Sequence, residues 1–238
     1  MKNEIPVDLK KIRTKLRSYE RKFRESPHDR DGSGVRFLMG PYYLCLNNLE
    51  GAIVHYDWFW DTYPDSIDEP FHTLGQIITK LRHGQEEGAQ SLLKRLYASN
   101  PYLLPHILDI DLGNIEIPGA SNWEEKPYVL NAPKELYSYL SPEEIKWLRG
   151  IWSESDFSAF VRAYNNIQLA LKGEPIGEHR RGLIDLRMKL ISRDLIQKDQ
   201  LEAERTVAFR AAIDMGRNSG VDDRSFEQII AGAKANHT

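Results

Sequence analysis

Histidine is the residue type here with the widest chemistry, because a neutral imidazole binds metals and moves protons near neutral pH. The chain has seven: His28, His55, His72, His83, His106, His179 and His237. No two of them are four residues apart, the spacing that places a pair of metal ligands on one helical face. His72 and His83 share a predicted helix but would stand about 16 Å apart, too far to hold one ion. The histidine pattern therefore predicts no metal site.

Acidic clusters are the second candidate for chemistry. The stretch "DIDLGN" at residues 109–114 begins like a calcium loop, but it lacks the third acidic position and the final glutamate of such a loop. Ser141 and Glu144 flank Pro142 at the start of a predicted helix, where they would form a capping box. Helix caps and solvated loops account for the paired carboxylates, so we predict no catalytic role for them.

Nucleophiles and phosphate loops are also missing. The single cysteine, Cys45, lies between apolar neighbours, as a packed thiol does. The sequence has no glycine-rich phosphate loop, no dinucleotide fingerprint and no nucleophile elbow. We therefore predict no catalytic residues, no metal and no cofactor, in a protein that is not an enzyme. One alternative stays open, an active site assembled from distant residues in a cleft between helices near Trp123 to Trp152.

Composition narrows the remaining function classes. With 238 residues and a net charge of −3, the chain can bury a sizeable core and has no overall attraction to nucleic acid or anionic membranes. No run of about 18 apolar residues occurs, and the N-terminus lacks the apolar centre of a secretory signal. Together with the lone cysteine, these features predict a soluble, cytoplasmic protein that does not bind membranes.

Helices are the elements expected to position any site. Residues 8–25 form the first, with Asp8 as N-cap and apolar residues at alternating steps of three and four: Leu9, Ile12, Leu16, Tyr19 and Phe23. Its other faces carry eight basic and two acidic residues. Such a helix is either a solvated face beside a docked stripe or a contact for nucleic acid or an acidic partner.

Residues 35–108 read as four helices, and two stretches within them match at a fixed offset of 37 residues. The matched pairs are Phe37 and Leu74, Leu44 and Leu81, Ala52 and Ala89, Tyr56 and Leu93, Phe59 and Leu96, Trp60 and Tyr97, and Pro64 and Pro101. Asn47 then corresponds to Gly84 at the turn within each unit. A constant offset over two helices and a turn indicates an internal repeat, and the alanines mark close helix crossings.

The second helix of the first unit contains an unusual aromatic run, "HYDWFWDTYP". Four of its rings are spaced as one inward stripe: Tyr56, Phe59, Trp60 and Tyr63. Trp58 is out of phase with them, in line with His55 and Thr62. It either packs on the basic N-terminal helix, which we favour, or stays exposed as an anchor for a partner.

Each unit resembles a tetratricopeptide repeat, a helix-turn-helix of about 34 residues with small residues at fixed positions and a final proline. The residues at the family's spacing are Met39, Gly40, Tyr43, Ala52, Tyr56 and Pro64 in the first unit, and Gly84, Ala89, Leu93 and Pro101 in the second. Arg36 replaces the usual tryptophan, and Ile77 and Lys80 replace a glycine and a tyrosine. The resemblance covers about 70 residues and implies an all-α fold, a TPR-like stack of antiparallel helix hairpins with extra N- and C-terminal helices.

The resemblance also implies a function. In that family the first helix of each hairpin lines a concave face that binds a protein or peptide. By this analogy, the partner-binding residues are Arg36, Tyr43, Asn47, Thr73, Gln76, Ile77 and Lys80, together with Trp58 if it is exposed. We therefore expect a non-catalytic scaffold for protein–protein interaction.

We expect the whole chain to be organised in four consecutive segments. Residues 1–27 form the basic capping helix, and residues 28–117 form two hairpins and the start of a third. Residues 118–177 form an irregular crossing segment and a helical pair, with a short strand expected just before them, at 114–117. Residues 178–238 form a long mixed-charge helix and a short final helix. The long helix is either an arm, through which a homodimer would form, or a helix lying across the repeats.

The C-terminus has a resemblance of its own. Residues 208–235 are similar to the C-terminal arm of ParD-type antitoxins, through Gly216, Ser219, Gly220 and Phe226. The DNA-binding strand that precedes such an arm is absent. The resemblance implies an alternative function, a regulator that antagonises a toxin through this arm or associates with nucleic acid through the basic N-terminal helix.

Overall fold

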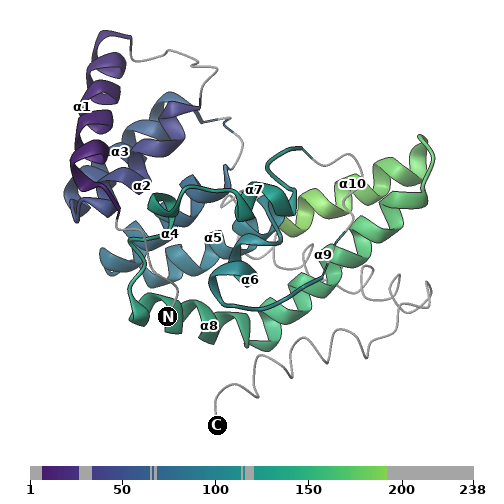
Figure 1. The fold of residues 1–238 in the computed structure, drawn as a ribbon. Helices are drawn as coiled ribbons and strands as arrows, with labels where there is room; N and C mark the ends of the chain where they lie inside the picture. Colours follow the sequence, from purple (N-terminus) through teal and green to yellow (C-terminus); the bar gives the residue numbers. More distant parts are fainter. Residues whose placement is uncertain are drawn as a thin grey trace. The chain divides into compact units, whose positions relative to one another are not determined.

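The computed structural model describes residues 7–26, 34–64, 66, 69–113, 115 and 121–191 of the chain. Most of these residues are helical and none of them is in a strand, as the all-α prediction required (Figure 1). Of the predicted strand at 114–117, only Ile115 is described, and its backbone is irregular. The residues that resemble an antitoxin arm lie outside the described part. No described helix is long and apolar enough to cross a membrane.

The chain divides into two compact units, each built from two separate stretches of sequence. The first combines Met1–Ser99 with Leu130–Glu144, and the second combines Asn100–Val129 with Ile145–Thr238. The segment Leu130–Glu144 was expected to belong to the crossing segment and helical pair of residues 118–177. It returns instead to the first unit.

The N-terminal helix α1, Leu9–Glu25, begins where the sequence indicated. The Oδ1 atom of Asp8 accepts a hydrogen bond of 3.0 Å from the backbone N–H of Lys11. Three residues of the expected stripe are buried: Ile12, Leu16 and Phe23. Leu9, in the first turn, is 47% exposed, so the docked part of the stripe begins one turn later than predicted.

Four helices of the first unit form two hairpins. Helix α2, Val35–Cys45, turns into α3, Leu49–Thr62, and α4, Pro70–Arg82, turns into α5, Glu86–Ser99. Helix α2 packs against α1, α3 and α4, while α4 also packs against α3 and α5. The central helix α4 is therefore enclosed by other helices along most of its length.

The turns of the two hairpins are built alike. Asn47 and Gly84 both have positive φ angles, +54° and +77°. In each turn, the N–H of the next residue donates to a carbonyl five residues back at 2.9 Å, as in a Schellman motif. The two positions predicted to correspond thus share a left-handed backbone. Ala52 and Ala89, near the start of the second helices, are both fully buried.

The aromatic run on α3 is packed on more than one side. Tyr56 and Phe59 are buried as predicted, whereas Trp60 and Tyr63 are only half-buried. His55, expected on another face, is buried as well, because α3 contacts both α1 and α4. Trp58 packs on Phe23 of α1 with ring centroids 5.2 Å apart, which is the arrangement that we favoured.

Helices α2, α3 and α4 meet closely around the hydroxyl of Tyr56. This hydroxyl donates a hydrogen bond of 2.9 Å to the backbone carbonyl of His72. A Cβ atom placed on Gly40 of α2 or on Gly75 of α4 would fall well inside van der Waals contact with it. The glycines therefore let three helices approach one aromatic side chain.

The second unit contains the later helices. The expected third stacked helix is short, since α6 spans only Leu103–Ile107, and α7, Lys126–Leu130, is equally short. Helix α8, Pro142–Trp152, begins in the first unit. Helix α9, Ser155–Gly173, buries the predicted stripe of Phe157, Phe160, Val161, Tyr164, Ile167 and Leu171.

The last described helix, α10, Glu178–Ile191, packs on α9. Leu183 and Leu190 of α10 are buried, while Ile184 and Met188 of the same helix are 36% and 53% exposed. Whether a homodimer forms through this helix stays a prediction.

Candidate functional site

The two helices that carry most of the predicted partner contacts, α2 and α4, hold a segment of the same chain. Leu130–Glu144 includes the short 3-10 helix η1, Lys134–Leu136, which packs on α2. Leu136 and Tyr139 are buried, and the ring of Tyr137 stacks on Phe71 of α4 with centroids 6.3 Å apart. We call Leu130–Glu144 the returning segment. It contacts α2 through Cys45 and α4 through Phe71 and Arg82, none of which is among the predicted partner contacts.

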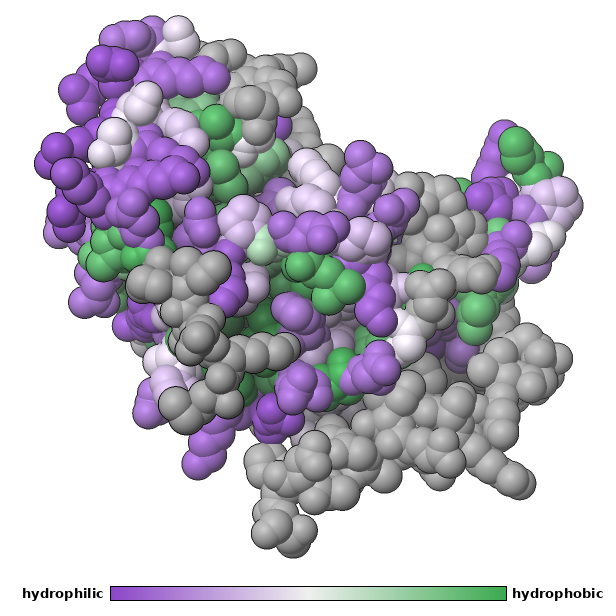
Figure 2. Space-filling view, viewed as in Figure 1, coloured by the Kyte–Doolittle hydropathy of each residue, from purple (hydrophilic) through white to green (hydrophobic). Residues whose placement is uncertain are grey.

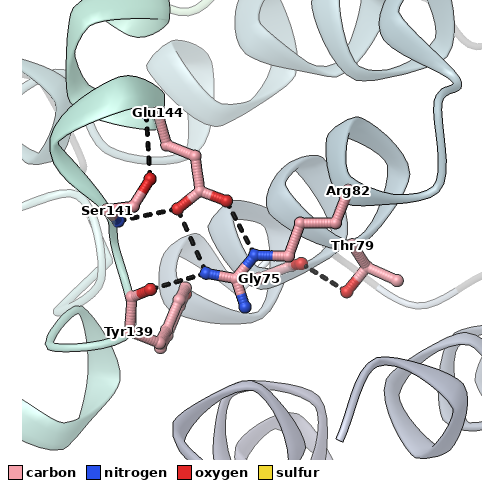
Figure 3. Close-up of polar contacts among 6 residues, drawn as sticks. All are labelled: Gly75, Thr79, Arg82, Tyr139, Ser141 and Glu144. Carbon is pink, nitrogen blue, oxygen red and sulfur yellow. Dashed lines mark hydrogen bonds and ion pairs between the residues drawn. The ribbon is translucent and has the colours of Figure 1, made fainter. Parts of the chain in front are cut away.

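Arg82, the last residue of α4, fixes the returning segment (Figure 3). Its Nε donates to Oε1 of Glu144 at 2.7 Å, and its Nη2 donates to Oε2 at 3.1 Å and to the carbonyl of Tyr139 at 2.6 Å. The planar guanidinium meets the carboxylate with two hydrogen bonds at once. Only 9% of the Glu144 side chain is exposed, so water screens this pair weakly.

Glu144 also completes the capping box that the sequence predicted. Its Oε2 accepts a hydrogen bond of 2.8 Å from the N–H of Ser141, and its own N–H donates to the Ser141 hydroxyl at 3.2 Å. The cap could be predicted because it involves only four consecutive residues. The ion pair could not be predicted, because Arg82 lies 62 residues from Glu144 in the sequence.

A second contact with the returning segment comes from Cys45, at the end of α2. Its thiol donates to the carbonyl of Glu135 at 2.7 Å. Burial raises the pKa of the thiol to about 11, so at neutral pH it remains protonated. The interpretation of Cys45 as a packed thiol agrees with this environment.

The Arg82–Glu144 pair can be tested by its effect on stability. Glu144→Gln keeps an acceptor for the cap but removes the charge, so Arg82 is left without its counter-ion; we expect a loss of about 2 kcal/mol or more. Ser141→Ala removes only the capping hydroxyl and should cost about 1 kcal/mol. Urea unfolding followed by circular dichroism measures both values. A loss below about 0.5 kcal/mol in Glu144→Gln would show that the pair adds no stability.

Three of the predicted partner contacts on α4 are in the core. Thr73, Gln76 and Ile77 are 1%, 8% and 0% exposed. The analogy assumed that one side of α4 faces solvent, but α2, α3 and α5 pack around this helix. A partner would reach these three side chains only if the core opened, so they do not form part of an accessible surface.

Three further predicted residues are half-buried and engaged within the first unit. The guanidinium of Arg36 lies over the rings of Phe37 and Tyr63, 4.5 and 5.3 Å from their centroids. The Tyr43 hydroxyl donates to Oε1 of Glu20 on α1 at 2.7 Å. Burial raises the pKa of Tyr43, and this hydrogen bond raises it further. Trp58 contacts α1 in the same way, so these side chains hold the unit together.

The remaining two predicted residues lie beside the hairpin turns. Asn47 is exposed at the first turn. Lys80 is half-buried near the second, where its Nζ donates to Oε1 of Gln85 at 3.2 Å. Of the predicted set, these two offer polar groups at the ends of the hairpins.

A buried histidine pair, His55 and His72, was not predicted from the sequence. The Nε2 atoms of His55 on α3 and His72 on α4 lie 3.3 Å apart, and the residues are 3% and 1% exposed. Spacing within one helix does not indicate this pair, because the two residues are 17 apart and lie on two helices. One signal was present, since His55 stands inside a run of aromatic residues.

The histidine pair is held neutral by its surroundings. The ring of Phe59 lies 4.2 Å from that of His72, centroid to centroid, and Trp58 packs beside His55. Burial lowers the pKa of His55 to about 3. Burial, followed by the nearby His55 and Arg36, holds the pKa of His72 well below its usual value. Both rings are closed off from solvent, so this geometry favours a structural role over a catalytic one.

The pair also lacks the remaining parts of a metal site. His55 Nδ1 has no hydrogen-bond partner in the described part of the chain. Among the described residues, no group of three or more histidine, cysteine, aspartate or glutamate side chains is placed to hold a metal ion.

The polar groups near Trp123 hold backbone in place. Asn100, which is fully buried, donates from Nδ2 to the carbonyls of Trp123 and Glu125. Its Oδ1 accepts a hydrogen bond of 2.8 Å from the N–H of Tyr102. These bonds fix the backbone just before α7. They lend no support to the alternative of an active site near Trp123 to Trp152.

No family model matches the chain, and the comparisons with curated proteins and with solved structures find no match either.

Proposed function

We propose that the protein is a non-catalytic scaffold that binds another protein or a peptide through its two helix hairpins. The observation that carries the proposal is how α2 and α4 hold the returning segment. Cys45 and Arg82 bind the backbone carbonyls of Glu135 and Tyr139, and backbone groups are what a peptide of any sequence offers. The equivalent turns and buried alanines of the two hairpins support the resemblance to peptide-binding repeats.

The returning segment limits where a partner binds. Leu136 and Tyr139 are buried in a segment that packs on α2 and is bound by Arg82 of α4, so a partner on these helices has to bind beside the segment or displace it. Asn47 and Lys80 are the predicted contacts with accessible polar groups, and both lie beside the turns. We therefore place the partner at the ends of the hairpins.

A pair of substitutions tests this placement. Asn47→Gly removes the side chain and keeps the left-handed turn, since glycine already occupies the corresponding position 84. Lys80→Ala removes the ammonium group. Partners are first identified by cross-linking and mass spectrometry with the wild-type protein, and their affinities are then measured by titration. We expect the double variant to bind at least tenfold more weakly.

The matched control is Lys189→Ala, which removes the same single positive charge at an exposed position on α10 of the second unit. Its affinity should stay within twofold of the wild-type value. Equal affinity for the double variant and the wild type, with both folded, would exclude the hairpin ends as the binding site. A partner lost equally in both variants would point to a general charge effect.

A further inference from the structure

Helix α1 concentrates positive charge on one outer surface of the first unit. Leu9–Glu25 contains eight basic and two acidic residues, a net charge of +6, although the whole chain has a net charge of −3. Figure 2 shows the hydrophilic surface that lies over this helix. A local charge of this size attracts polyanions even when the protein as a whole is acidic.

Five of these cations form one line along the helix. Lys10, Arg13, Arg17, Arg21 and Arg24 follow one another at steps of three or four residues, so they lie on the same side. All five are exposed, and none has a side-chain ion pair or hydrogen bond to another described residue. The line is about 21 Å long, with about 5 Å between successive positions. We call it the basic row.

The other faces of α1 are fixed against the hairpins. Ile12, Leu16 and Phe23 are buried, and Glu20 accepts the hydrogen bond from Tyr43 of α2. Lys15 donates to the hydroxyl of Tyr42 at 3.4 Å. The helix is thus held along its length, which leaves the basic row facing solvent on a rigid element. A membrane is a poor fit for α1, because most of its apolar stripe is already buried and cannot insert.

We propose that the basic row binds the phosphate backbone of single-stranded nucleic acid without reading its sequence. Four of the five residues are arginines, whose guanidinium groups match phosphate with two hydrogen bonds. A straight row of regularly spaced cations fits a flexible strand with one charge per nucleotide, whereas the phosphates of a duplex follow a helical path. The row contains no aromatic or amide side chain that would read bases, so the contacts are to phosphate alone.

This proposal is independent of the scaffold function and predicts a steep salt dependence. The probe is a fluorescein-labelled 20-nucleotide oligouridylate RNA, and binding to the full chain is measured by fluorescence anisotropy. Five phosphate contacts give a slope of roughly −3.5 in a plot of log association constant against log salt concentration. The affinity should therefore fall by about 100-fold between 50 and 200 mM KCl. No binding at 50 mM KCl would overturn the proposal.

Two triple variants with the same change of net charge separate the basic row from general electrostatics. Arg13→Glu, Arg17→Glu and Arg21→Glu alter the row, whereas Lys146→Glu, Arg181→Glu and Lys189→Glu alter exposed positions of α8 and α10. We expect at least a 20-fold loss of affinity in the first variant and less than a threefold loss in the second. Equal losses would contradict a site on α1.

Circular dichroism melting confirms that each variant is folded. If the glutamate variant melts at a lower temperature than the wild type, the three arginines are replaced by glutamine instead, and at least a fivefold loss of affinity is expected.

Competition with poly-glutamate distinguishes nucleic acid from acidic protein segments as the ligand. Displacement of the RNA by poly-glutamate at the same concentration of charge would assign the row to acidic protein segments and reject the proposal.

Discussion

The Gly75→Ala variant is expected to be about 3 kcal/mol less stable than the wild type, and a second substitution, Tyr56→Phe, is expected to restore most of that loss. The added methyl group would collide with the Tyr56 hydroxyl, while its other neighbours, on Pro41, lie at an ordinary 3.4 Å. Removal of the hydroxyl removes the collision. Tyr56→Phe alone should cost about 1 kcal/mol, through the lost hydrogen bond to the His72 carbonyl.

Gly40→Ala provides the contrast, because the same rescue should fail there. A Cβ atom at Gly40 would meet carbon atoms of the Tyr56 ring as well as its hydroxyl, and phenylalanine keeps those carbons. Gly88→Ala on α5 is the matched control, since its nearest neighbour is the flexible side chain of Lys80 at 3.5 Å. That variant should gain up to about 1 kcal/mol from helix propensity.

Urea unfolding of the single and double variants measures these differences. If Tyr56→Phe rescued Gly40→Ala and Gly75→Ala equally, the ring would have moved, and the packing of α2, α3 and α4 described here would be wrong. If it rescued neither, the collision would not involve the hydroxyl.

The stability of the protein is expected to fall steeply between pH 6.5 and pH 5, because of the buried histidine pair. Burial lowers the pKa of His55 to about 3 and holds the pKa of His72 well below the ordinary histidine value of 6.5. In the unfolded chain both rings take up a proton near pH 6.5, while in the folded chain they remain neutral. Their contribution is therefore complete above pH 6.5 and is lost as the pH falls. Each histidine contributes a slope of about 1.4 kcal/mol per pH unit, or about 2.7 for the pair.

The free energy of unfolding at pH 7.5, 6.5, 5.75 and 5.0 measures this slope. His55→Phe suits the aromatic surroundings and removes one of the two groups, so its slope should be about half that of the wild type. His83→Gln is the control, since His83 is exposed. Its slope should be unchanged. An unaltered slope in His55→Phe would mean that the acid sensitivity arises elsewhere.

Local patterns in the sequence were enough to predict much of the helical framework. The cap at Asp8, the capping box at Ser141 and the stripe on α9 each depend on residues within one or two turns. The turn correspondence between Asn47 and Gly84 was also readable, because a repeated offset carries the geometry of one hairpin to the next. The caps and the stripe depend on short-range spacing, whereas the turn correspondence depends on the repeated offset.

Contacts between segments that are distant in the sequence could not be predicted from such local patterns. Polar residues of α4 looked like surface positions, yet the Thr79 hydroxyl is buried and donates to the carbonyl of Gly75 at 2.8 Å. A hydrogen bond of this kind satisfies the hydroxyl within its own helix, so the side chain can be buried without a bound water molecule. The pairing of Arg82 with Glu144 depends on a long excursion of the chain, and no periodicity reports it.

The prediction of the candidate site was also limited because contacts between distant segments cannot be inferred from local patterns. A family resemblance assigns residues to a face, but it does not report that other helices of this chain pack on that face. Thr73, Gln76 and Ile77 were placed on that face and are buried. Asn47 and Lys80 retain accessible polar groups, since they lie beside the turns.

The divided first unit has a consequence for the order of synthesis. Ser99 ends α5, but Glu144, which pairs with Arg82, leaves the ribosome only after a further 45 residues. At about 5 to 20 residues per second, the hairpins wait roughly 2 to 9 s for the piece that shields Phe71 and the end of α4. Nascent chains in this interval expose an apolar strip, and a protein cut after residue 99 would keep it permanently. Chaperone capture and aggregation should therefore be concentrated in this window of translation.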